Sequence, residues 1–178
     1  MGFLSFANYQ NILDKCNYEL QRLDTCSKHP EYDYLIFNIV FGLNPLYEWA
    51  IKDPEISTNL KARIIKEFNP YRCYKRVADG LKKYYNEECF PQTNEYQEVI
   101  RELCNKAKHF SKKAIEQQQK NYTCGAGEVG MQAGEPEAVA GTFNHYKYYV
   151  DISGVEVELT TVLASLVECW KTTIEEHR

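Results

Sequence analysis

The sequence predicts a mainly α fold, a helical bundle of about five to six helices with a small β-hairpin before the C-terminal helix. Three observations lead to this prediction. Apolar residues recur at helical spacing through most of the chain, one early segment is apolar nearly all round, and one late segment alternates apolar and polar residues. A chain of 178 residues, 44% of them hydrophobic, has the size and composition of one globular domain, so we expect residues 1–178 to share one core.

The first two predicted helices differ in how much of their surface is apolar. Between positions 6 and 23, apolar residues follow the spacing of one helix face, which predicts an amphipathic helix. Residues 33–52 are apolar nearly all round and predict the central, buried helix of the bundle. Pro45 lacks an amide hydrogen and crowds the carbonyl of Phe41, so we expect a kink or break near residues 42–44.

Three further helices are expected after the central one. The segments 57–68 and 71–85 have helical periodicity and are separated by an Asn-Pro turn signal. The third helix is preceded by Thr93 and Asn94, either of which is a suitable N-cap, and we expect it to run to about Lys113. This helix carries the most concentrated polar pattern in the sequence.

A glycine-rich segment follows at residues 121–141. It holds five glycines, one proline and three glutamates without periodicity, which predicts a loop of about 20 residues. Loops of this length are either functional or disordered. Gly125, Gly127 and Gly130 have the spacing of a dinucleotide-binding fingerprint, but no apolar strand precedes them. We therefore expect no nucleotide cofactor, and the chain has no other cofactor motif.

The C-terminal part predicts a hairpin and a final helix. Residues 145–159 alternate at period two around Ser153-Gly154, the pattern of a β-hairpin with a two-residue turn. We expect the face with Val155, Val157 and Leu159 to pack on the helices, because a lone hairpin is marginally stable in water. A helix should begin at Thr160 or Thr161. Its apolar side consists of Leu159, Val162, Leu163, Leu166, Val167, Trp170 and Ile174.

The charges are distributed in blocks. The net charge is −4, yet residues 61–83 sum to +6 and residues 101–120 to +4, and the remaining parts of the chain are acidic. This pattern fits a local patch for phosphate-bearing ligands and excludes a generally basic nucleic-acid coat. The alternative is that both blocks are solvated helix faces.

The cysteines and the apolar segments indicate the compartment. Seven cysteines at irregular spacing include no Cys-x-x-Cys pair, so we expect neither a disulfide framework nor a metal site. The first residues lack the pattern of a secretory signal, and polar residues interrupt the longest apolar stretch, 34–51. These features predict a cytoplasmic protein that does not insert into a membrane.

The polar pattern of the helix before Lys113 forms a candidate site. On a helical wheel, Arg101, Asn105, Lys108 and Lys112 lie within about 60° of one another, opposite an apolar face, and His109 borders them. Cations, an amide and an imidazole on one side of a helix can hold a phosphate and move a proton near neutral pH. Candidate catalytic residues are therefore His109, Arg101 and Asn105, and candidate phosphate-binding residues are Lys108 and Lys112. The alternative is a solvated helix face with a histidine at its border.

Three features, in this order, resemble a known superfamily. They are the buried run 33–53, the helix end Arg101-x-x-x-Asn105-x-x-Lys108-His109-Phe110, and a closing hairpin followed by a helix with a tryptophan. Together they resemble the HEPN superfamily of small helical bundles, which includes metal-independent endoribonucleases of toxin–antitoxin and anti-phage systems. The resemblance implies that residues 1–178 form a single HEPN-like domain.

The resemblance also implies a chemistry and partners. His109 matches the terminal histidine of the superfamily motif, and Asn105 matches its polar position. Such enzymes use the ribose 2′-hydroxyl as nucleophile, with His and Arg assisting, at a site between two protomers. The motif arginine is displaced here, because Arg101 stands one helical turn too early. The implied partners are RNA or a nucleotide-like ligand, a second copy in a homodimer, and a cognate antitoxin or defence protein. The alternative is a non-catalytic protein-interaction module, with the polar stripe as its contact surface.

Overall fold

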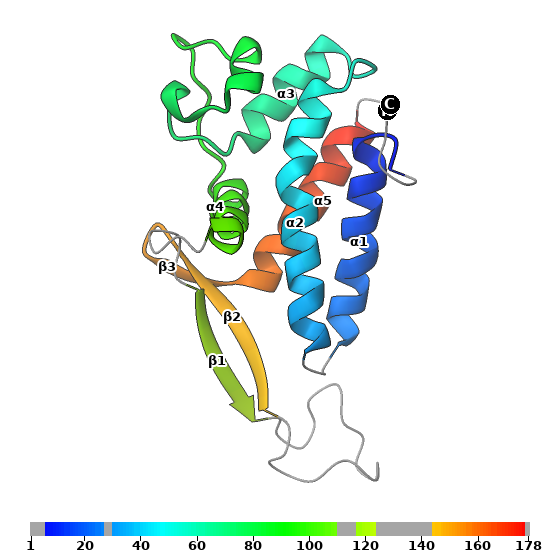
Figure 1. The fold of residues 1–178 in the computed structure, drawn as a ribbon, viewed down its shortest axis with the longest axis vertical. Helices are drawn as coiled ribbons and strands as arrows, with labels where there is room; N and C mark the ends of the chain where they lie inside the picture. The colour runs from blue at the N-terminus through cyan, green and yellow to red at the C-terminus, as the bar shows by residue number, and fades with distance from the viewer. Residues whose placement is uncertain (1–5, 27–29, 110–116, 124–143, 177–178) are drawn as a thin grey trace.

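The computed structural model describes residues 6–26, 30–109, 117–123 and 144–176 and is mainly helical (Figure 1). The fold class predicted from the sequence is confirmed, with a hairpin directly before the last helix. In chain order the elements are α1 (Tyr9–Thr25), α2 (Glu31–Lys52), α3 (Thr58–Phe68), the 3₁₀ helices η1 (Tyr74–Arg76) and η2 (Asp79–Tyr84), α4 (Glu95–His109), β1 (Gln117–Thr123), β2 (Asn144–Ile152), β3 (Val155–Glu158) and α5 (Leu159–Glu175).

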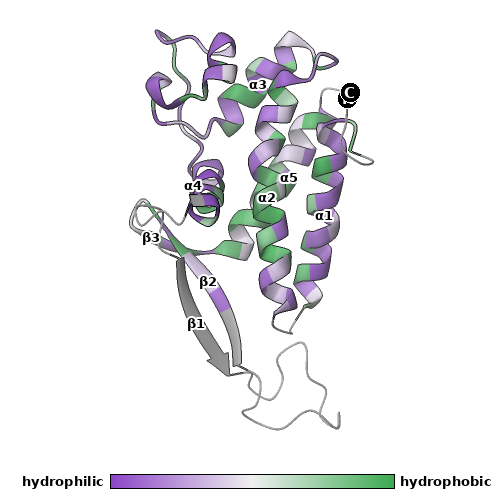
Figure 2. Cartoon of the chain, in the orientation of Figure 1, coloured by the Kyte–Doolittle hydropathy of each residue, from purple (hydrophilic) through white to green (hydrophobic). Residues whose placement is uncertain are grey.

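The helices α1, α2 and α5 lie side by side and form the centre of the bundle (Figure 1). Their hydrophobic residues face one another, whereas the segment from α3 to η2 at one end of the bundle is largely hydrophilic (Figure 2). The helix α4 packs across α2 and α5, and the sheet lies on the same side of the molecule as α4. No helix in the described part of the chain is long and apolar enough to cross a membrane.

The first two helices approach each other closely at Gly42. A Cβ atom on Gly42 would lie 2.5 Å from the Sγ atom of Cys16, so only glycine allows this contact without a shift of the neighbouring helix. Burial raises the pKa of the Cys16 thiol to about 12. The side chain is therefore a small apolar contact and not a reactive thiol at neutral pH.

The sequence predicted a kink or break near residues 42–44, and a break there is wrong, because α2 continues through Pro45 to Lys52. A proline inside a helix removes only one backbone hydrogen bond, and α2 is held on both sides of it by fully buried residues such as Ile39, Leu43 and Leu46. One face of α2 stays outside the core, since Tyr34 and Phe37 are exposed.

The segment after α3 is not the single helix predicted over residues 71–85. It forms η1 and η2, joined by extended residues, and it is organised around the buried side chain of Asn69. The amide nitrogen of Asn69 donates to the carbonyls of Tyr71 (2.8 Å) and Pro91 (3.0 Å), and its oxygen accepts the hydroxyl of Tyr85 (3.0 Å). The first of these bonds satisfies a carbonyl that a helix over residues 71–85 would satisfy along its own backbone, and the other two tie Asn69 to Pro91 and Tyr85 further along the chain.

The sheet has three strands in the order β1-β2-β3, both pairs antiparallel. The hairpin of β2 and β3 is confirmed, with Ser153 (φ 54°) and Gly154 (φ 83°) in the left-handed conformation that a tight two-residue turn requires. The predicted loop at 121–141 is wrong at its start, because Asn121–Thr123 end strand β1. The rest of that loop lies outside the described residues.

The hydrophobic face of the hairpin was predicted only in part. Val157 packs against the core, but Val155 is exposed, and the strand residues buried on the helices are Val150 and Ile152 of β2. The final helix begins at Leu159, one residue before the predicted start at Thr160 or Thr161, and each of its seven predicted apolar residues is buried. The largest of them, Trp170, stacks on Phe68 with ring centroids 4.0 Å apart.

Candidate functional site

The candidate site residues lie on α4, which Asn94 caps. The backbone amide of Gln97 donates to the Asn94 side chain at 2.8 Å, while the other predicted cap, Thr93, donates to the carbonyl of Tyr71. Gln97 is buried, and its side chain donates to the carbonyl of Leu43 (3.3 Å) and accepts from the indole of Trp170 (3.5 Å). These bonds join α4 to α2 and α5 and set the direction in which its polar side points.

Arg101 is engaged inside the protein. Its Nε donates to the carbonyl of Pro70 at 3.2 Å, its guanidinium lies 5.4 Å from the ring centroid of Tyr71, and it forms an ion pair with Glu102. Only 19% of the side chain is exposed. Arg101 therefore holds the segment after α3 on α4, and this role competes with the predicted role in binding or stabilising phosphate.

The other predicted residues lie further along the same helix. Asn105 is half-buried and Lys108 is exposed, with its ammonium 5.8 Å from the ring centroid of Phe41 on α2. Burial raises the pKa of the neighbouring thiol of Cys104, and the charge of Lys108 opposes that rise. His109 is the last residue of α4, and its side chain and the whole of Lys112 lie outside the part of the molecule that the structure describes. The structure thus brings Arg101, Asn105 and Lys108 to one side of α4.

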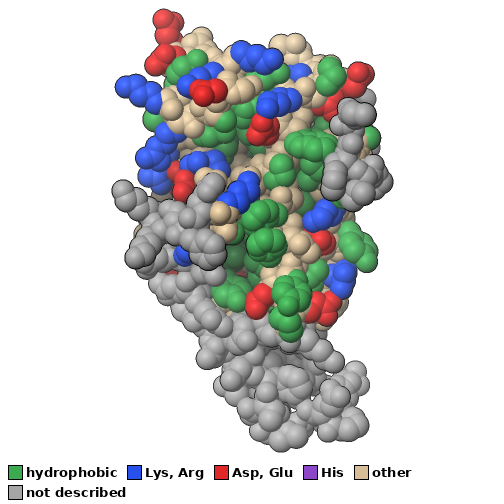
Figure 3. All heavy atoms as spheres, viewed as in Figure 1, with side chains coloured by type: hydrophobic (Ala, Val, Ile, Leu, Met, Phe, Trp, Pro, Cys, Tyr) green, Lys and Arg blue, Asp and Glu red, His purple; other side chains and the backbone are tan. Residues whose placement is uncertain are grey.

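A second group of cations surrounds Tyr84. The ammonium groups of Lys83 and Lys61 lie 4.9 and 5.8 Å from its ring centroid. Lys75 and Arg76, on η1, are exposed and form no ion pair with any residue that the structure describes. We call Lys61, Tyr84, Lys75, Arg76 and Lys83 the basic face. Lys and Arg side chains gather along this edge of the molecule (Figure 3).

The sequence located the basic block but did not show which of its cations lack an ion-pair partner in the described part of the chain. Three other cations of residues 61–83 form ion pairs: Arg63 with Glu67 and Glu176, Arg72 with Glu98, and Lys82 with Asp79. The pairs Arg63–Glu67 and Lys82–Asp79 follow from spacing along a helix, whereas Arg63–Glu176 depends on the packing of α5 beside α3. An ion pair that depends on packing has no signal in the sequence.

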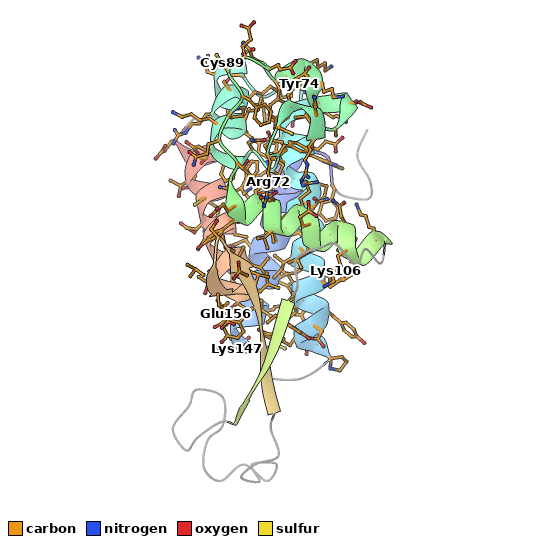
Figure 4. The ribbon with its side chains drawn as sticks, turned by 90° about the vertical axis from the view of Figure 1, so that its left-hand side faces the viewer. Arg72, Tyr74, Cys89, Lys106, Lys147 and Glu156 are labelled. Carbon is orange, nitrogen blue, oxygen red and sulfur yellow. The ribbon has the colours of Figure 1, made fainter. Side chains whose placement is uncertain are left out.

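The segment that carries Lys75 and Arg76 meets α4 at Arg72. The guanidinium of Arg72 forms an ion pair with Glu98 at 2.6 Å, and the hydrogen bond that it donates to this carboxylate raises the arginine pKa. Figure 4 shows Arg72 beside α4 and Lys106 near the other end of that helix. The helix α4 therefore extends from that segment to the exposed side of α2.

A groove lies at that other end of α4. It has a volume of about 310 Å³ and runs between α2, α4 and the sheet. Its walls include Phe37 and Phe41 of α2, Leu103 and Lys106 of α4, and Tyr148 of β2. We call it the aromatic groove. The hydroxyl of Tyr148 donates to the carboxylate of Asp33 at 2.6 Å and fixes one end of it.

Comparison of the chain with protein-family models, with curated proteins and with solved structures found no match. The resemblance to the HEPN superfamily therefore stays a prediction from the motif and the order of elements.

Proposed function

We propose that this protein binds RNA through the basic face. The observation that supports the proposal most is a set of four cations that form no ion pair in the described part of the chain: Lys61 and Lys83 lie over the partly exposed ring of Tyr84, and Lys75 and Arg76 are exposed on η1. Cations without protein partners bind phosphate without first losing an ion pair, and the release of counterions from RNA favours the complex. An aromatic ring between cations is a common surface for stacking a base. Outside residues 61–83 and 101–120 the chain is acidic, which disfavours RNA contact with the rest of the surface.

Removing two of these charges should weaken RNA binding. For the double variant Lys75→Gln/Arg76→Gln we expect a roughly tenfold higher Kd for single-stranded RNA. The salt dependence, as the slope of log K against log salt concentration, should fall by about 1.4, since each phosphate contact on a single strand contributes about 0.7. Fluorescence anisotropy of a labelled oligonucleotide at several salt concentrations measures both quantities.

A matched control removes the same charge elsewhere. Arg22→Gln/Lys171→Gln neutralises two cations on α1 and α5, both of which are paired with glutamates in the structure. The control should bind RNA like the wild type. An equal loss in both double variants would mean that net charge alone is responsible, and no binding by the wild type would leave the protein-interaction module as the better reading.

Cleavage of the bound RNA needs a separate test. Because the guanidinium of Arg101 is engaged with Pro70, Tyr71 and Glu102, we expect binding without cleavage. The measurement is incubation of the wild type and of His109→Ala with total RNA in the absence of divalent metal, followed by gel analysis. Cleavage by the wild type that is lost in His109→Ala would contradict this expectation and would favour the HEPN-type nuclease. The implied homodimer and cognate antitoxin remain part of that nuclease hypothesis.

A further inference from the structure

One face of α2 exposes aromatic side chains that the core does not use. Tyr34 is 63% exposed and Phe37 52% exposed, and Phe41 is half-buried one turn beyond Phe37. The rings of Phe37 and Phe41 are stacked with centroids 4.2 Å apart. Three neighbouring aromatic rings on the exposed face of one helix form an apolar patch, and such a patch indicates a ligand with its own flat apolar face.

The surroundings of this patch indicate that the ligand also carries negative charge. The ammonium of Lys108 lies 5.8 Å from the Phe41 ring. The groove lining holds Lys106 and one carboxylate, that of Asp33, which accepts the hydroxyl of Tyr148. The groove volume of about 310 Å³ suits one planar group and is small for a helix of a partner protein. Aromatic rings beside cations complement the base and the phosphate of a nucleotide.

The position of the groove connects it with the basic face. Arg101 contacts Pro70, next to the basic block, and Lys108 contacts Phe41 in the groove, both from α4. Seven residues of α-helix separate them, a distance of about 10 Å. The polar side of α4 thus leads from the segment after α3, which carries Lys75, Arg76 and Lys83, to the groove, and a single strand can follow it. Bases paired in a duplex cannot leave their stack to enter it without a cost.

We infer that the aromatic groove binds one unpaired base of the RNA by stacking it on Phe37, with the adjoining phosphate at Lys108. This inference rests on the proposed function and narrows the ligand class to single-stranded RNA. The basic face contributes affinity for any backbone, and the groove contributes the preference for unpaired bases.

The test compares the exposed ring in the groove with a similarly exposed ring elsewhere. Phe37→Leu should weaken binding of a short single-stranded RNA about tenfold and leave binding of an abasic strand of equal length unchanged. Tyr18→Leu, at a residue 61% exposed on α1, should change neither. Anisotropy titrations give the affinities, and circular dichroism checks that both variants fold.

A second variant reports on stacking directly. Phe37→Trp places an indole in the groove, and its fluorescence, taken as the difference from the wild type, should be quenched by the single-stranded RNA and not by the abasic strand. Equal affinities of wild type and Phe37→Leu for the RNA would overturn the inference and leave the basic face as the binding surface. Absence of RNA binding by the wild type would overturn the proposed function as well.

Sedimentation velocity tests whether a second copy of this chain, and not RNA, occupies the groove. If the wild type is a dimer that Phe37→Leu dissociates while the RNA affinity stays constant, the groove is an interface between copies of this chain, and the inference is wrong. If the wild type and Phe37→Leu have the same oligomeric state and only the RNA affinity changes, the inference stands.

Discussion

Trp170→Ala is expected to lower the free energy of unfolding by about 4 kcal/mol. Trp170 is fully buried on α5, stacks on Phe68 at 4.0 Å and donates its indole N–H toward Gln97 at 3.5 Å. Its removal leaves a cavity where α3, α4 and α5 meet and also removes a partner of a buried amide. Chemical denaturation followed by circular dichroism measures the change.

Two further variants show whether this loss comes from packing. Trp170→Phe keeps a ring against Phe68 and should cost roughly half as much as the alanine variant. Trp49→Ala, at a half-buried tryptophan on α2, should cost about 1 kcal/mol. If Trp170→Ala were no less stable than Trp49→Ala, the contact between α5 and α3 would not be part of the core.

Asn69→Ala is expected to lower the free energy of unfolding by about 3 kcal/mol. The side chain is fully buried, and its loss leaves the carbonyls of Tyr71 and Pro91 and the hydroxyl of Tyr85 without this partner. Each unsatisfied buried polar group costs about 1–3 kcal/mol. Because the neighbouring groups partly relax, the loss of stability is smaller than the sum of the costs of the separate bonds. Denaturation measures the total, and hydrogen exchange should show the earliest loss of protection at residues 71–93.

An exposed asparagine is the control for this prediction. Asn86 also accepts a backbone amide hydrogen, that of Glu88 at 2.9 Å, but it is solvent-exposed. Asn86→Ala should therefore change the stability by less than about 1 kcal/mol. Similar losses for the two alanine variants would contradict the assignment of Asn69 as the residue that organises η1 and η2. The RNA affinity of Asn69→Ala should also fall, because Lys75, Arg76 and Lys83 lie on that segment.

Periodicity alone located the long helices and the hairpin. The apolar side of α5 was predicted residue by residue, because every seventh residue of a helix returns to nearly the same side and only one side can be buried. The turn at Ser153-Gly154 was equally clear, since few residue pairs tolerate two left-handed conformations. The grouping of Arg101, Asn105 and Lys108 on one side of α4 follows from the same arithmetic of the helix.

Features that depend on distant partners were not predictable. Strand β1 begins with three glutamines and has no alternation of apolar residues, so its pairing with β2 is the only thing that identifies it. The two 3₁₀ helices replace the expected helix because Asn69 supplies hydrogen bonds across more than twenty residues of sequence.

The candidate site likewise has features that follow from local spacing and features that depend on distant partners. The sequence by itself determined the bundle, the hairpin, the basic block and the face of α4 on which its polar residues lie, because these follow from local spacing and composition. Only the tertiary structure decided which cations keep a protein partner: Arg101 binds a carbonyl 31 residues away, while Lys75 and Arg76 have no ion-pair partner in the described part of the chain. The physical reason is that a hydrogen bond or an ion pair depends on distances of a few ångströms, which packing sets and spacing along the chain does not.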